Sequence, residues 1–370
     1  MRRGAALQDL AIIEDGSVLV RDGIIAAIGT TRRIENLKEA RAAIEIPVSG
    51  SIIMPAFIDP SLGLNLETSN GRAAHPVKRK RLAEFNDESL TLMRACLQHG
   101  TLTAEVKAHG AFGDFRSDIT VLRRLIDIST QPIGLIRTWR IGHPPRSEEQ
   151  LASFQEALIA ITGRKLARFL ELVVQPEEPL HPLLFAVPET ARLPIKLHWP
   201  GGPADVLSGI LARLSPFTIS SPSSLSESEC AVLKRVNSLL VFCPGREVLE
   251  ERNGDCARQL TEDGAAIAIA SGYDATHAPG FSMQMAVAFA VLRLRLPVEA
   301  AIAAATVNAA YAVGCGQVAG TLEFGKRADL LVLNVPDYRE IPRRLGINHV
   351  GFAIREGNLV LNRTRWRMGA

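Results

Sequence analysis

Short apolar runs alternate with amphipathic segments through most of this chain, and this alternation restricts its fold more than any other feature. The apolar runs have the length of buried parallel strands, and the segments between them have helical spacing. Candidate strands cover residues 101–107, 133–139, 170–174, 193–198, 239–243 and 265–270, and candidate helices include 84–98, 122–128, 148–161 and 283–294. Units repeated this often predict a parallel barrel or a doubly wound sheet. No Gly-x-Gly-x-x-Gly sequence follows a strand, so dinucleotide binding loses its main support.

Composition excludes several classes of protein. The 370 residues suit a barrel with a small accessory domain. The net charge of +3 is too small to predict a nucleic-acid partner, and we interpret the basic run 78–81 as a solvated loop. Long uninterrupted apolar stretches are missing, so no membrane span is expected. The five scattered cysteines argue against a disulfide framework or a structural zinc site, which makes a cytoplasmic location the expectation.

Two stretches near the amino terminus carry further information. Asp22-Gly23 separates two apolar runs and predicts a hairpin, because glycine adopts positive φ without steric cost. Residues 52–63 form a longer apolar run in which Pro55 precedes Phe57 and Ile58. Proline is tolerated at the start of a strand but not in its middle, so a buried strand is expected just after it.

The run 52–63 resembles the first barrel strand of the amidohydrolase superfamily, in which apolar residues lead to His-x-His. The segment 320–333, with Gly-Lys-Arg-Ala-Asp before an apolar run, resembles the superfamily's return to its small sheet domain. Residues 103–107, 306–312 and 335–350 narrow the resemblance to the imidazolonepropionases. The resemblance covers nearly the whole chain and is strongest from residue 265 onward.

This resemblance implies a (β/α)8 TIM-like barrel of the metal-dependent hydrolase type, with a small β-sandwich built from both chain ends. The expected division is sandwich at 1–53, barrel at 54–319 and sandwich again at 320–370. The resemblance also implies a homodimer.

Catalysis in that family depends on one zinc or iron ion, held by the His-x-His pair, a histidine ending strand five and an aspartate after strand eight. In this chain Ser61 and Gly63 stand at the first two positions, and Gly272 stands where the aspartate is expected. Only His198 remains. Three protein ligands plus water are what such catalysis requires, so we expect no metal ligands and no cofactor here.

Several side chains of the family's site are retained or replaced by polar ones. The candidate catalytic residues are His198 and His143, and the candidate ligand-binding residues are Arg72, Glu105, Lys107 and Asp274. The serine-rich stretch 220–224 stands near a second histidine position of the family. We interpret it as a loop, because no Gly-x-Ser-x-Gly sequence surrounds it.

Two classes of function remain open. The first is a non-catalytic homologue with a ligand-binding, scaffolding or regulatory role, whose ligand is a small anionic ring compound. The alternative is a hydrolase of a cyclic amide, working without metal with His198 or His143 as base and Arg72 as anion clamp. Its variant is a relocated metal site from the histidines that follow predicted strand ends: His109, His143, His198 and His277. A mouth filled by Leu62, Leu64 and Trp199 would favour the first class.

Overall fold

The computed structural model describes residues 1–64, 82–108, 115–128, 132–143, 145, 147–177, 184, 185, 187, 189, 191–220, 225–249, 255–274 and 278–363.

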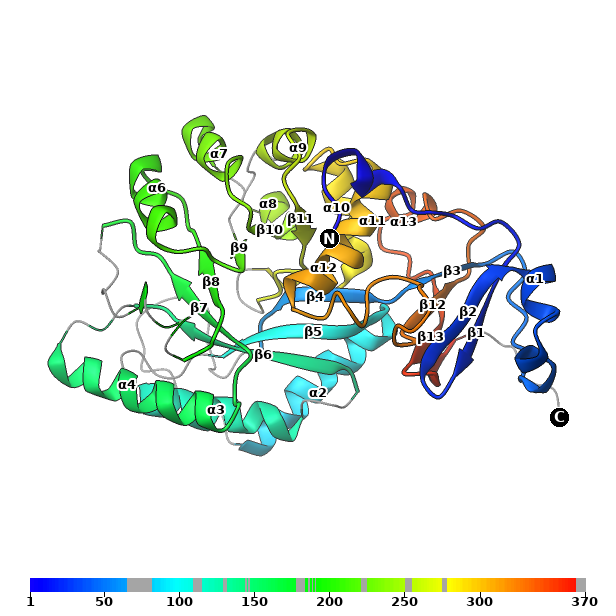
Figure 1. The fold of residues 1–370 in the computed structure, drawn as a ribbon, viewed down its shortest axis with the longest axis horizontal. Helices are drawn as coiled ribbons and strands as arrows, with labels where there is room; N and C mark the ends of the chain where they lie inside the picture. Colours follow the sequence, from blue (N-terminus) through cyan, green and yellow to red (C-terminus); the bar gives the residue numbers. More distant parts are fainter. Residues whose placement is uncertain are drawn as a thin grey trace.

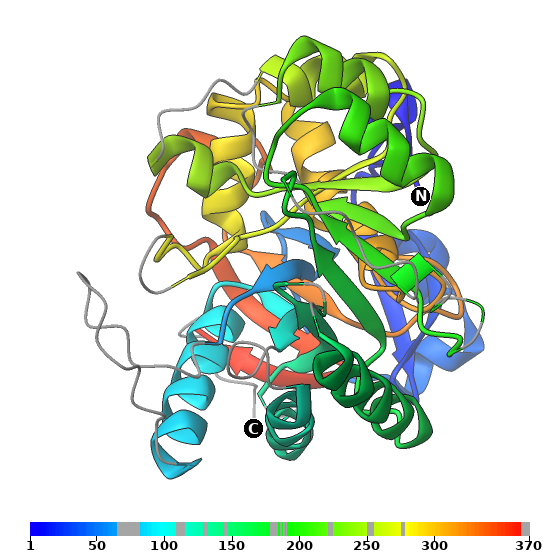
Figure 2. The same ribbon diagram turned by 90° about the vertical axis from the view of Figure 1, so that its left-hand side faces the viewer.

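Eight parallel strands form the central sheet, and each pairs with the strand that follows it in the sequence. They are β4 (Phe57–Leu62), β5 (Thr101–Ala108), β6 (Gly134–Ile141), β7 (Phe169–Val173), β8 (Ile195–His198), β9 (Thr218–Ser220), β10 (Leu239–Phe242) and β11 (Ile267–Ile269). Just beyond β11, a parallel bridge joins Tyr273 to Leu62 of β4. The sheet therefore curls back onto its first strand (Figure 2) and confirms the expected (β/α)8 barrel.

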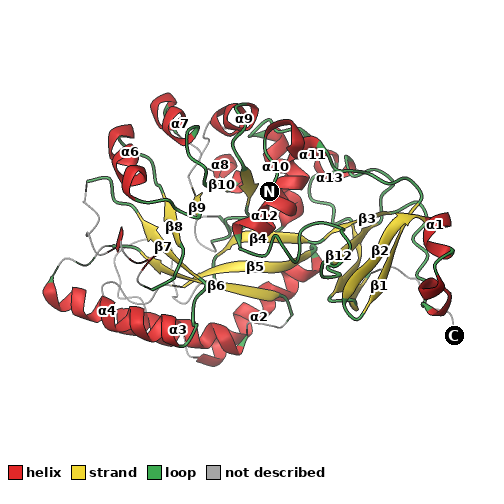
Figure 3. Cartoon of the chain, in the orientation of Figure 1, coloured by secondary structure: helices red, strands yellow, loops and turns green. Residues whose placement is uncertain are grey.

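Helices surround this sheet on its outer side (Figure 3). They are α2 (Leu82–Gln98), α3 (Phe115–Asp127), α4 (Glu148–Gly163), α6 (Ala204–Arg213), α7 (Glu227–Leu233), α8 (Pro244–Leu249), α9 (Asp255–Glu262), α10 (Met283–Leu292), α11 (Val298–Ala305) and α12 (Val307–Ala312). Side chains that point outward from the strands bury the helices' apolar faces. Trp139 of β6, for example, stacks on Phe154 of α4 with ring centroids 5.4 Å apart.

The small sheet domain contains strands from both chain ends, as expected (Figure 1). The hairpin at Asp22-Gly23 forms as predicted from β1 (Gly16–Arg21) and β2 (Ile24–Thr30). A second, antiparallel sheet contains β3 (Ile52–Pro55), β12 (Leu330–Leu333), β13 (Val350–Arg355) and β14 (Asn358–Asn362). Ile25 and Leu330 pack between the two sheets. The expected boundary at residue 54 falls inside β3, and β4 begins only at Phe57.

Short helical segments complete the described chain. They are the 3-10 helices η1 (Gly4–Gln8) and η2 (Lys38–Ala42), and the helices α1 (Thr31–Glu35) and α13 (Glu340–Arg343). None of the helices in the described ranges is long and apolar enough to cross a membrane.

A disulfide joins Cys230 of α7 to Cys256 of α9. The cysteine spacing had argued against a disulfide framework, and the structure corrects this expectation with a single bridge. The partners lie 26 residues apart, on helices that follow different strands, so no local sequence pattern connects them. Cys96, Cys243 and Cys315 are free thiols.

Candidate ligand site at the barrel mouth

Charged and polar side chains line the inside of the barrel from β5 to β9. Alternate residues of a strand point to the same face of a sheet, so the inward-facing residues of neighbouring parallel strands gather together. We call the following residues the polar cluster: Glu105, Lys107, Arg140, Glu171, Lys196, His198 and Ser220. The carboxyl ends of the strands lie at the barrel mouth, where sites on this fold are found.

The deepest part of the polar cluster is an ion pair between Lys196 of β8 and Glu105 of β5. Both side chains are fully buried, and Thr138 donates a hydrogen bond to the second Glu105 oxygen at 2.7 Å. The Lys196 ammonium also donates to the carbonyl of Ala312 at 2.7 Å. Burial lowers the pKa of Lys196, and the charge of Glu105 opposes that shift. Both carboxylate oxygens of Glu105 therefore have partners within the protein, although the sequence suggested Glu105 as a ligand-binding residue.

A second carboxylate, Glu171 of β7, lies nearer the mouth between two cations. Lys107 of β5 pairs with one oxygen, and the Arg140 guanidinium of β6 lies 3.3 Å from the other. Burial would raise the pKa of Glu171, but the positive charges of Lys107 and Arg140 outweigh burial and hold the pKa at about 2. Lys107, a predicted ligand-binding residue, thus lies at the site and is ion-paired there.

His198 ends β8 beside this pair and is only partly exposed. Its Nδ1 lies 3.0 Å from the hydroxyl of Ser220, and that hydroxyl lies 3.4 Å from Glu171. Burial and the charge of Arg140 lower the pKa of His198 to about 3. The imidazole is therefore neutral at physiological pH and can exchange hydrogen bonds with a ligand.

Positive charge exceeds negative charge around His198. Besides Lys107 and Arg140, the cation of Arg246 on α8 acts on the imidazole. The Arg246 Nε donates to the carbonyl of Gly272 at 3.3 Å, which holds this side chain beside the end of β11. Among the described groups, the cations of Arg140, Lys107 and Arg246 and the carboxylate of Glu171 thus act on His198. This balance favours an anionic ligand over a metal cation.

The backbone at Gly63 leaves no room for a side chain. Its N–H donates to the carbonyl of Tyr273 at 2.9 Å, and a Cβ added at residue 63 would stand 2.4 Å from that oxygen. A histidine, which the metal-binding pattern would place here, cannot fit against this backbone. Ser61, the other substituted position, donates its N–H to Asp59 at 3.0 Å.

The backbone at Gly272 is equally restricted. Its φ of +63° lies in the left-handed region, and a Cβ there would stand 2.7 Å from the Cβ of Cys243. An aspartate at this position would collide with Cys243. Within the ranges that the structure describes, no three His, Cys, Asp or Glu side chains are grouped closely enough to hold a metal ion. Among the described residues, Ser61, Gly63 and Gly272 do not fit the catalytic metal of the hydrolases that this fold resembles.

Direct hydrogen bonds join β4 to the end of β11, next to the positions at which the family's metal ligands are expected. The fully buried Asp59 accepts bonds from the Ser271 N–H at 3.0 Å and from the Ser271 hydroxyl. Burial raises the pKa of Asp59, and the bonds from Ser271 and Ser61 oppose the shift. The Ser271 hydroxyl in turn accepts the N–H of Tyr273 at 3.1 Å. These contacts, with the Gly63–Tyr273 bond, form the β4–β11 closure.

The other predicted site residues are only partly brought together. His143 follows β6, two strands away from His198 in the sheet, and Asp274 follows Tyr273 at the β4–β11 closure. Arg72, His109 and His277 lie outside the described residues. The predicted relocated metal site therefore stays a prediction.

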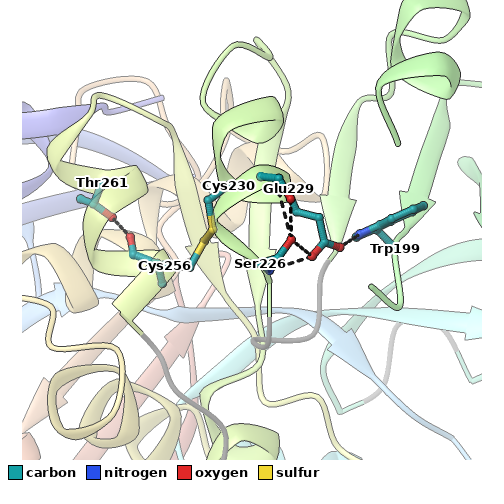
Figure 4. The surroundings of a disulfide bond; sticks show 8 residues. Trp199, Ser226, Glu229, Cys230, Cys256 and Thr261 are labelled. Carbon is teal, nitrogen blue, oxygen red and sulfur yellow. Dashed lines mark hydrogen bonds between the residues drawn. A yellow bond between two sulfur atoms is a disulfide. The ribbon is translucent and has the colours of Figure 1, made fainter. Parts of the chain in front are cut away.

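The three side chains that would fill a collapsed mouth do not all lie in the same place. Leu62 and Leu64 are buried near the β4–β11 closure. Trp199 is also fully buried, but its indole N–H donates to Glu229 of α7 at 2.6 Å, so it points into the outer helix layer (Figure 4).

Sequence reasoning missed several members of the site. Ser220 was assigned to a loop, but it ends β9 and bonds His198; the strand is only three residues long and continues into a serine run. Glu171, Arg140 and Lys196 were also missed. A charged residue inside an apolar strand run was the available signal for Glu171 and Lys196, because such a charge needs a buried partner.

Comparisons with known proteins agree with the barrel fold. A model of the Amidohydrolase family matches residues 249–348. The imidazolonepropionase of Brevibacillus brevis is 27% identical over 405 residues, covering 97% of this chain and 93% of that protein. That of Symbiobacterium thermophilum is 26% identical, covering 99% and 95%.

Among solved structures, E. coli guanine deaminase superimposes with a TM-score of 0.68 at 16% identity, covering 98% of both chains. An adenosine deaminase from Xanthomonas campestris with bound zinc has a TM-score of 0.68 at 16% identity, covering 96% of this chain and 91% of that one. These structural likenesses concern the fold.

Proposed function

Because this chain belongs to the amidohydrolase superfamily and is imidazolonepropionase-like, we propose that it is a non-catalytic homologue that binds a small anionic ring compound at its barrel mouth. In this proposal the chain has lost the catalytic metal centre, and its role is regulatory or that of a binding protein. The cytoplasmic location and the homodimer that the sequence suggested belong to the same proposal.

The observation that carries the proposal is the contact between Gly63 and Tyr273. A metal-ligating side chain at residue 63 would need the space that the Tyr273 carbonyl occupies. Gly272 is closed to a carboxylate in the same way by Cys243. Restoring metal ligands would therefore require the end of β11 to move, which would break the hydrogen bonds of the β4–β11 closure.

The electrostatics of the mouth support an anionic ligand. Lys107, Arg140 and Arg246 supply more positive charge than Glu171 neutralises. His198 and Ser220 supply neutral hydrogen-bonding groups beside these cations. A ring with polar atoms and a carboxylate has the chemistry that such groups recognise, since charge-assisted hydrogen bonds to carboxylates are among the strongest in proteins.

The proton affinities weigh against hydrolysis without metal. A general base works best when its pKa lies near the working pH. The pKa of His198 is about 3 and that of Glu171 about 2, so neither accepts a proton readily at neutral pH. Without a metal ion, the pKa of an attacking water stays at about 15.7. A ring-opening reaction would then have neither an activated water nor a suitable base from these two residues.

Binding and turnover of imidazolone propionate test the proposal in one sample. Calorimetry is expected to show a one-to-one complex whose affinity falls as the salt concentration rises, because dissolved ions screen the attraction between the ligand's charge and the cations of the site. The compound should be recovered unchanged after incubation. No binding at any salt concentration, or ring opening at the rate of an active hydrolase, would refute the proposal.

A further inference from the structure

The disulfide between Cys230 and Cys256 lies between two helices outside the barrel, with Glu229, Ser226 and Trp199 nearby (Figure 4). It crosslinks α7 to α9, which follow different strands of the barrel. The two side chains are mostly buried, with 8% and 7% of their surface exposed. The bridge therefore fixes the position of α7 relative to α9.

The residue before Cys230 is Glu229, whose carboxylate joins the segment 199–202 to the start of α7. It accepts the indole N–H of Trp199 at 2.6 Å and the N–H of Gly202 at 2.9 Å. Its second oxygen accepts the N–H of Ser226 at 2.7 Å, and Ser226 caps α7 in return. Through Glu229, the position of α7 determines the position of the segment 199–202.

This segment begins directly after His198. The backbone N–H of Trp199 donates to the backbone carbonyl of Ser220 at 2.9 Å. The hydroxyl of Ser220 is in turn the hydrogen-bond partner of His198. A displacement of α7 would therefore act on both residues that supply neutral hydrogen-bonding groups to the barrel mouth. A continuous series of bonded groups runs from the disulfide through Glu229 and Trp199 to His198.

We propose that Cys230 and Cys256 form a reversible redox switch that controls the order of the segment 199–202 and, through it, ligand binding at His198. In the oxidised form α7 is fixed, and Glu229 holds Trp199 and Gly202. In the reduced form α7 is released from α9, and the bonds to Glu229 loosen. The effect on ligand binding rests on the function proposed above, whereas the effect on the segment does not.

The oxidant is a low-molecular-weight disulfide of the glutathione class. The thiolate of one cysteine attacks a sulfur of that disulfide, forms a mixed disulfide and releases one small thiol. The thiolate of the other cysteine then attacks the protein sulfur of the mixed disulfide, forms the Cys230–Cys256 bond and releases the second small thiol. Two electrons pass from the cysteines to the oxidant, and their two protons end on the released thiols.

The location of the pair suits exchange of this kind. Both sulfurs belong to the outer helices and not to the barrel interior, so a small movement of α7 opens them to a small thiol. Disulfides in a reducing compartment are usually transient, catalytic or redox-sensing. No free cysteine occupies a comparable place in the described part of the chain: Cys96 and Cys315 are buried elsewhere, and Cys243 lies against Gly272.

Hydrogen exchange on the oxidised and the reduced wild-type protein tests the switch without any mutation. Titration between oxidised and reduced glutathione, followed by alkylation and mass spectrometry, identifies the redox state. We expect one reversible step that converts two thiols, accompanied by about tenfold faster amide exchange at Trp199, Gly202 and the start of α7 in the reduced form. Identical exchange of these amides in both forms would overturn the proposal, as would a bridge that resists millimolar reduced glutathione.

Two variants separate the switch from other effects of reductant. The double variant Cys230→Ser/Cys256→Ser should resemble the reduced protein and should not respond to glutathione; a response there would assign the effect to another cysteine and refute the proposal. Glu229→Gln keeps the disulfide but weakens the hydrogen bonds between α7 and the segment 199–202. The Gly202 amide of the oxidised variant should therefore exchange as fast as that of the reduced wild-type protein.

The affinity of the wild-type protein for imidazolone propionate should fall on reduction. If the compound binds neither form, the proposed function fails, and the exchange data still decide the switch.

Discussion

The carbonyl oxygen of Tyr273 accepts a hydrogen bond from the backbone of Gly63 and lies 2.4 Å from the place where a Cβ of residue 63 would stand. This contact closes the barrel between its first and last strands. It also removes the space in which a metal-ligating side chain would lie. The glycine at position 63 is therefore matched by the backbone packed against it, and replacing this glycine by histidine alone would not create a metal ligand here.

Replacing Gly63 by alanine should destabilise the protein by about 2 kcal/mol, because the added methyl group forces the Tyr273 carbonyl away and breaks its hydrogen bond. Urea unfolding measures the change. The matched control is Gly209→Ala in α6, where an added Cβ meets nothing within 4 Å. That control should be neutral or stabilising, by up to about 1 kcal/mol. Equal stabilities for the two variants would contradict the packing described here.

Removing one partner of the buried ion pair should be costly. Glu105→Gln leaves the Lys196 ammonium without its counter-charge in the barrel interior, and we expect a loss of about 3–5 kcal/mol in the free energy of unfolding. The double variant Glu105→Gln/Lys196→Met removes both charges and should recover much of that loss. A double-mutant cycle measured by urea unfolding checks this. If the two single losses simply add, the residues do not form the coupled pair that the structure shows.

His198 should make the protein lose stability on acidification. Its pKa is lowered to about 3 in the folded chain, from 6.5 in an unfolded one. The unfolded state therefore binds the proton first as the pH falls, and stability decreases between about pH 6.5 and 3 by at most about 1.4 kcal/mol per pH unit. His198→Asn should flatten this part of the stability profile, and nitrogen NMR should show a neutral imidazole at pH 5. A protonated His198 at pH 5 would contradict the electrostatic account.

Arg246 should contribute to binding without supporting the fold. Its side chain makes one long hydrogen bond, to Gly272, and its charge faces His198. Arg246→Gln should weaken binding of imidazolone propionate about tenfold, the value of one charge-assisted contact, with an unchanged melting temperature. The control Arg258→Gln removes an exposed cation of α9 that pairs with Glu262. Similar affinities for the two variants would show that net charge, and not the place of Arg246, attracts the ligand.

Strand and helix periods that repeat along the chain predicted a parallel barrel or a doubly wound sheet, and Asp22-Gly23 predicted the hairpin. The resemblance to the amidohydrolases narrowed these alternatives to a barrel with a small sheet domain from both chain ends. It also named His198 and Lys107 as site residues, and both lie near the carboxyl ends of their strands, β8 and β5. Glu171 and Arg140 were missed because they become neighbours only when β6 and β7 pair, and the sequence does not show the register of that pairing. The bridge from Cys230 to Cys256 depends on two helices packing side by side, and the β4–β11 closure depends on a main-chain carbonyl. Neither feature has a side-chain pattern that can be recognised in advance.

The most direct test of the central claim is the metal content of the purified protein, measured by mass spectrometry after growth with added zinc and iron, alongside an imidazolone propionate ring-opening assay. The account predicts less than about a tenth of an equivalent of zinc, iron, manganese or nickel, since a catalytic ion needs about three protein ligands, and no ring opening above the buffer rate. A stoichiometric ion together with turnover would contradict it.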